Sequence, residues 1–137
     1  MDLFAHIPHL ADLAILVERI SLGLIFWIHG RMKWQWWETQ PSEQMPASIL
    51  HILQGLSIAE PLGAIAIALG LLTRFAALGL CLVMLGAIPV LQKQGHSFKA
   101  RGTQAGWEYE FLLLVVSFSV LLVGPGSYSL DRLIFGF

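Results

Sequence analysis

The chain has 137 residues, of which 56% are hydrophobic and only 12% are charged, and its formal net charge at pH 7 is −1. Soluble domains carry about a quarter charged residues, so this composition argues against a soluble fold. The small net charge, with no basic stripe and no phosphate-binding loop in the sequence, argues against a nucleic-acid partner.

Four apolar stretches are long enough to cross a bilayer, whose hydrocarbon core of about 30 Å needs about 20 helical residues. In lipid every backbone polar group must be paired within its own segment, so each stretch is expected to be a helix. The first stretch contains Glu18 and Arg19, and no Lys or Arg precedes it. We therefore expect it to persist in the mature protein rather than to be cleaved as a signal peptide. The four expected spans are residues 10–29, 49–72, 75–92 and 106–124.

These spans predict a single all-α integral membrane domain over residues 1–137, folded as an antiparallel four-helix bundle. The connection at residues 72–74 is so short that the second and third spans must form a hairpin. After the fourth span, Gly124 suits a helix C-terminal cap and Pro125 cannot continue the helix. The tail beyond is predicted to be a short interfacial segment.

The polar loop at residues 31–46 contains Trp34, Trp36 and Trp37, which are typical of a membrane–water interface. The loops after the first and third spans together contain more Lys and Arg than the opposite side, which holds the termini and the 72–74 turn. The positive-inside tendency therefore places the two loops in the cytoplasm and both termini outside the cell.

Arg19 and Glu60 lie within the first and second spans, where a charge costs about 2.5–3.5 kcal/mol and therefore faces the protein interior. Counted from the same loop, each lies about 15–16 Å along its helix, so we expect the two to meet at equal depth. Pro61 frees the carbonyl group of Ser57, which would offer Arg19 a second acceptor. Such a pair either only fixes how the two helices dock or also binds a ligand.

A second polar group is expected at the loop side, where His29 ends the first span and Trp107 and Glu108 open the fourth. A quinone ring needs an apolar slot with a protonatable side chain, so these are candidate ligand-binding residues. No metal site is expected, because no two inward-facing histidines are spaced as paired ligands. On the opposite side, Arg74 and Asp131 fall at the same level and are expected to form a structural ion pair.

The order and spacing of several motifs is similar to that of one known family. The first span, "ERISLGLIFWIHGRMK", carries Arg19, His29, Gly30 and Lys33 at matching positions. Further matches are "AEPLGAIAIALGLLTR", with Glu60 and Arg74, and the segments "MLGAI", "GWEYEFLLL" and "GPGSYSLD". From about residue 16 to 131 the chain thus resembles the DoxX family of small four-span membrane proteins. One departure is Gln92, where many members have a histidine.

The resemblance implies a multi-pass protein of a bacterial or archaeal cytoplasmic membrane. For function, the resemblance first implies a membrane subunit of a quinone-linked oxidoreductase that binds quinone or a small sulfur compound. It assigns no catalytic residue. Arg19 and Glu60 would then form the buried polar core, and His29 and Glu108 would face the ligand. Two alternatives remain: a non-catalytic scaffold or assembly factor, and a small-solute or proton carrier. The expected partners are the lipid bilayer and either a second copy of the chain or another membrane protein.

Overall fold

The computed structural model describes residues 10–136, and within this range it is built from helices without an extended strand. The predicted all-α class is therefore confirmed, and each expected span contains one long helix. In chain order the elements are α1 (Leu10–Met32), the short 3-10 helix η1 (Lys33–Trp37), α2 (Ala47–Leu69), α3 (Thr73–Lys93), α4 (Glu108–Val123) and α5 (Leu130–Phe135).

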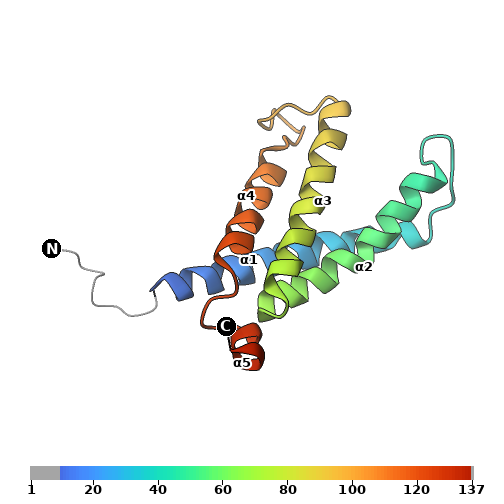
Figure 1. Cartoon of the computed structure of the whole chain (residues 1–137). Coiled ribbons are helices and arrows are strands. Elements are labelled where there is room, and N and C mark those ends of the chain that lie inside the picture. The colour runs from blue at the N-terminus through green and yellow to red at the C-terminus, as the bar shows by residue number, and fades with distance from the viewer. Residues whose placement is uncertain (1–9, 137) are drawn as a thin grey trace.

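The four long helices form two antiparallel hairpins, α1–α2 and α3–α4 (Figure 1). The hairpins meet near the turn between α2 and α3, and α2 diverges from α3 away from this turn, so the expected four-helix bundle is not confirmed. All four helices nevertheless contribute to one apolar core, because each helix packs one apolar face against its neighbours. The core residues are Leu22, Phe26, Ala64, Ile67, Ala77, Leu80, Met84, Leu113 and Val120.

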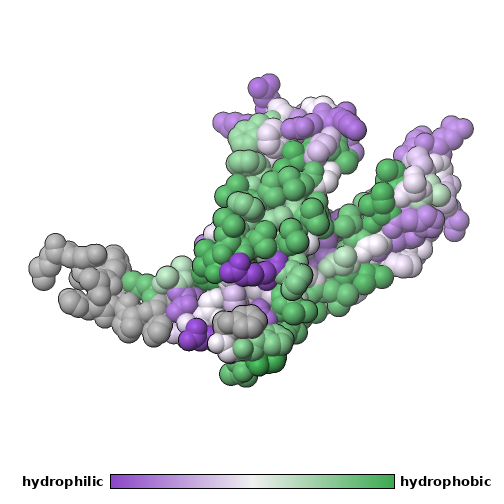
Figure 2. All heavy atoms as spheres, in the orientation of Figure 1, coloured by the Kyte–Doolittle hydropathy of each residue, from purple (hydrophilic) through white to green (hydrophobic). Residues whose placement is uncertain are grey.

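The outer faces of the long helices are apolar, and hydrophilic residues gather mainly toward the ends of the hairpins (Figure 2). Each long helix exposes large aliphatic side chains, for example Leu24, Leu62, Leu82 and Leu122. Within the described residues, α2 and α3 are each long and apolar enough to cross a membrane. Continuous apolar surface of this kind is rare on a soluble monomer, which supports the reading as a membrane protein.

Two glycines of α1 set its register against α2. A Cβ atom at Gly23 would lie 2.8 Å from the carbonyl oxygen of Ala64, and one at Gly30 would collide with the ring of Pro61. Small residues allow such close backbone approach between helices in lipid. Because Gly30 is opposite Pro61, the first turns of α2 extend beyond the end of α1. The loop that follows α1 folds back against these turns.

This close approach predicts that Gly30→Ala loosens the α1–α2 hairpin. The added methyl group must displace the ring of Pro61, and overpacking of this kind costs about 1–3 kcal/mol. We expect a lower unfolding temperature for the detergent-solubilised variant, measured by circular dichroism. The matched control is Gly55→Ala in α2, where a Cβ atom would meet nothing within 4 Å. Equal unfolding temperatures for the two variants would contradict the packing described.

Candidate functional site

The polar notch expected at Glu60 and Pro61 is present, but its cation comes from a different residue. Lys33 Nζ lies 2.5 Å from Glu60 Oε2, and the Glu60 side chain is only 1% exposed. Lys33 opens η1 immediately after α1, so its side chain reaches the middle of α2. The predicted ion pair between Arg19 and Glu60 is therefore wrong.

The reason lies in the register of the two helices. The sequence count assumed that the first span ends and the second begins at one level, whereas α1 runs on to Met32 and Gly30 lies opposite Pro61. Glu60 is thus level with the end of α1. Arg19 lies eleven residues before Gly30, which corresponds to about 16 Å along the helix.

The carbonyl group freed by Pro61 also has a different partner from the one expected. Trp34 Nε1 donates to the carbonyl oxygen of Ser57 at 3.0 Å, and Trp37 Nε1 donates to Ser57 Oγ at 2.8 Å. The Ser57 hydroxyl in turn donates to the carbonyl oxygen of Gln54 at 2.6 Å. The tryptophan-rich loop is therefore attached to α2 by its indole N–H groups, a role that the interfacial reading of these residues missed.

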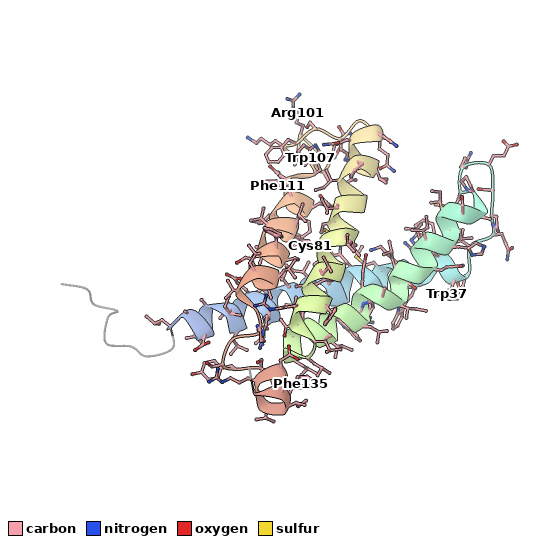
Figure 3. All side chains as sticks on the ribbon, in the orientation of Figure 1. Trp37, Cys81, Arg101, Trp107, Phe111 and Phe135 are labelled. Carbon is pink, nitrogen blue, oxygen red and sulfur yellow. The ribbon has the colours of Figure 1, made fainter. Side chains whose placement is uncertain are left out.

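These contacts build an open cavity of about 560 Å³ on the α1–α2 hairpin. Figure 3 shows Trp37 on this hairpin, far from Trp107 and Phe111 on the other. The cavity, which we name the tryptophan groove, has a largely apolar lining, and two of its lining residues, Trp34 and Pro61, directly follow Lys33 and Glu60 in the chain. Its lining residues are Trp27, Trp34, Trp37, Ser57, Ile58, Pro61, Leu62 and Ile65.

The residues predicted at the loop side do not share this groove. His29 stacks on Tyr109 with 5.7 Å between ring centroids, so it links α1 to the start of α4. Glu108 Oε1 accepts a hydrogen bond from the Ala100 N–H at 3.2 Å, within the loop between α3 and α4. Trp107 packs edge-on against aromatic side chains of the same loop and of α4. His29 and Glu108 are thus near one helix end but have different partners.

Arg19 instead holds the opposite end of the fold together. Its side chain is 1% exposed, and its two terminal nitrogens donate to the carbonyl oxygens of Pro125 at 2.6 Å and Tyr128 at 2.5 Å. Gly70, in the left-handed conformation with φ 70°, lies against the guanidinium group, and a Cβ atom there would overlap it. Arg19 thereby joins α1, the α2–α3 turn and the segment after α4.

Asp131 does not pair with Arg74, so that prediction is also wrong. Its carboxylate accepts the backbone N–H groups of Leu72 at 2.6 Å and Thr73 at 2.8 Å. Leu72 has φ 48°, a left-handed conformation that is rare for leucine. This conformation turns two successive N–H groups toward one carboxylate, which caps the start of α3. Asp131 does tie the turn to the tail as expected, but through the backbone.

This cap predicts an acid-sensitive contribution to stability. Burial alone would raise the pKa of Asp131, but the hydrogen bonds from Thr73 and Leu72 and the charge of Arg19 outweigh it and lower that pKa. A lowered pKa stabilises the fold above the ordinary aspartate value of about 3.9, and this stability is lost as the pH falls from there through the lowered pKa.

We therefore expect Asp131→Asn to lower the free energy of unfolding by about 1.5–3 kcal/mol at neutral pH. The variant should also show a smaller loss of stability on acidification than the wild type, measured by thermal unfolding in detergent across the acidic range. Glu43→Gln, in the exposed 38–46 loop, serves as the control. Parallel pH profiles for wild type and Asp131→Asn would rule out this role.

Comparison with known proteins places the chain in a family. The DoxX family model matches residues 14–93, more than half of the chain, and the match includes most of α1 and all of η1, α2 and α3. A protein of Bacillus subtilis (strain 168) named "Putative oxidoreductase CatD" is 27% identical over 128 residues, which cover 90% of this chain and 89% of that protein. No solved structure matches the chain significantly. The match contains the buried charges Arg19 and Glu60, and the chain belongs to the DoxX family.

Proposed function

We propose that this protein is a membrane subunit of a redox system and that it binds a quinone in the tryptophan groove. The observation that carries the proposal is the groove itself: an apolar cavity of about 560 Å³ with indole walls, whose lining residues Trp34 and Pro61 adjoin in the chain the two partners of the Lys33–Glu60 ion pair. The family and the name of the Bacillus subtilis relative support a redox connection.

The groove suits the chemistry of a quinone head group. Such a ring is flat and largely apolar, and the indoles of Trp27, Trp34 and Trp37 offer flat apolar surfaces against which it can stack. Its two carbonyl oxygens need hydrogen-bond donors, and Lys33 has three N–H donors, of which Glu60 takes one. When bound, a quinone accepts two electrons and two protons. In this proposal Lys33 and Glu60 hold a proton at the edge of the ring.

This choice changes the ligand-binding role that the sequence suggested for several residues. Glu60 keeps a place at the site, and Arg19 supports it only from a distance by holding the fold. His29 joins the hairpins through Tyr109, and Glu108 and Trp107 organise the α3–α4 loop. A small sulfur compound remains the alternative substrate class. Since quinone binding does not itself supply electrons, we propose a partner, either a second copy of the chain or another membrane protein.

Quinone binding can be measured by equilibrium dialysis of the detergent-solubilised full chain against empty micelles. The probe is the tailless benzoquinone 2,3-dimethoxy-5-methyl-1,4-benzoquinone, which partitions only weakly into detergent. We expect saturable binding by the wild type. Ile58→Trp should weaken it about tenfold or more, which corresponds to about 1.4 kcal/mol, because the larger side chain fills the groove.

The matched control is Leu85→Trp on α3, since Ile58 and Leu85 are 50% and 52% exposed and both point outward. This control separates loss of the groove from a general effect of an added indole. Glu60→Gln then tests whether the ion pair takes part in binding. The proposal fails if the wild type shows no saturable binding, or if Ile58→Trp and Leu85→Trp bind the probe equally.

For the placement in the membrane, we propose four crossings of the cytoplasmic membrane with both termini outside. The apolar outer faces of all four long helices support this, together with the excess of Lys and Arg in the 31–46 and 93–105 loops. At 16 residues, α4 spans about 24 Å, so its crossing requires local thinning of the bilayer.

This orientation predicts which introduced cysteines a membrane-impermeant maleimide can reach. In a Cys81→Ser background, Glu43→Cys in the 38–46 loop should be labelled only after cells are opened. Gly136→Cys, near the C-terminus, should be labelled in intact cells. The reverse pattern would show that the orientation is inverted, and labelling of both sites from one side would exclude the three crossings proposed between them.

A further inference from the structure

A second cavity, of about 480 Å³, lies at the opposite end of the fold from the tryptophan groove. It is formed where the α2–α3 turn, the end of α4 and helix α5 meet. Figure 2 shows hydrophilic side chains between the end of α4 and the apolar surface of α5. We name this cavity the arginine pocket, and its lining includes Thr73, Arg74, Phe75, Asp131, Arg132 and Phe135.

The carboxylates that line this pocket are already engaged by the protein. Asp12, which also lines the pocket, accepts the N–H and the hydroxyl group of Ser127, each at 2.8 Å. Both oxygens of Asp131 accept backbone N–H groups of the α2–α3 turn. The buried charge of Arg19 acts on Asp131 and offsets its negative charge. These carboxylates are therefore not the partners of the two arginines in the lining.

The arginines, in contrast, have no such engagement. Among residues 10–136, neither the Arg74 nor the Arg132 guanidinium group makes a hydrogen bond or an ion pair, and both residues are exposed. Arg74 is held against the end of α4, since a Cβ atom at Gly124 would lie 3.1 Å from its Nη2. Two uncompensated guanidinium groups at one cavity favour an anion, above all one with several oxygens.

The rim of the pocket indicates that the anion belongs to an amphiphile. Phe75 is 74% exposed, and Phe135 and Leu72 are also exposed at the lining. Aromatic and aliphatic side chains beside arginines at a helix end are typical of the membrane–water interface. We propose that the arginine pocket binds the phosphate of an anionic phospholipid headgroup, with Arg74 and Arg132 as its cationic contacts and the acyl chains along the apolar rim.

This site is independent of the tryptophan groove, and its test uses the full chain in detergent. Isothermal titration calorimetry compares three probes: dihexanoyl phosphatidylglycerol, dihexanoyl phosphatidylcholine and inorganic phosphate. Both lipids are used below their critical micelle concentrations. We expect saturable binding of the anionic lipid, and much weaker binding of the zwitterionic lipid and of free phosphate. The double variant Arg74→Gln/Arg132→Gln should weaken binding of the anionic lipid about tenfold or more, which corresponds to about 1.4 kcal/mol.

The matched control is Lys99→Gln/Arg101→Gln, which removes two exposed charges from the α3–α4 loop at the other end of α4. It should bind the anionic lipid like the wild type. Equal binding of inorganic phosphate and the anionic lipid would identify a site for free oxoanions and overturn the lipid assignment, as would unchanged lipid binding by the arginine variant. If that variant unfolds, the test uses the unfolding temperature of the wild type, which the anionic lipid should raise more than the zwitterionic lipid does. Equal effects of the two lipids would overturn the proposal.

Discussion

The architecture depends on the burial of one guanidinium group. Arg19 is buried, where an unpaired charge is costly, and the carbonyl oxygens of Pro125 and Tyr128 accept hydrogen bonds from its two terminal nitrogens. These acceptors become available only when the chain after α4 folds back over the α2–α3 turn. That return brings Asp131 to the start of α3, where it caps two N–H groups. The need to solvate one cation with backbone carbonyls therefore positions α5, orders the turn and creates the arginine pocket.

Glu60 poses the converse problem, a buried anion, and the chain solves it at the other end of the α1–α2 hairpin. Because the helix register separates Arg19 from Glu60, the partner of Glu60 is Lys33, the first residue after α1. Reaching Glu60 draws the following residues down onto α2, where the indoles of Trp34 and Trp37 find the acceptors of Ser57. The tryptophan groove is thus a consequence of how a buried carboxylate and a proline-freed carbonyl are satisfied together.

The two cavities consequently follow one physical pattern at opposite ends of the molecule. In each, a buried charge holds a segment outside the long helices, and exposed aromatic side chains lie near charged groups at the edge of an apolar surface. Such sites suit ligands that are partly apolar and partly polar, and both a quinone and a phospholipid are of this kind. The hairpins that carry the sites meet near the α2–α3 turn, so a membrane redox subunit built this way would combine a lipid-facing support with a separate place for its reactive ligand.

The helical class and the approximate helices could be predicted from the amino-acid sequence, because long apolar blocks in lipid have no other way to pair their backbone groups. The sequence also indicated that Arg19, Glu60, Pro61 and Asp131 organise the contacts between segments, since buried charges and a mid-helix proline need compensating partners. Which of these groups meet depends on how the helices pack in three dimensions. The contact of Gly30 with Pro61 shifts α2 along α1, and this shift separates Arg19 from Glu60 while it brings Lys33 within reach. Register depends on how two surfaces interlock, and that information is absent when residues are counted along each helix alone.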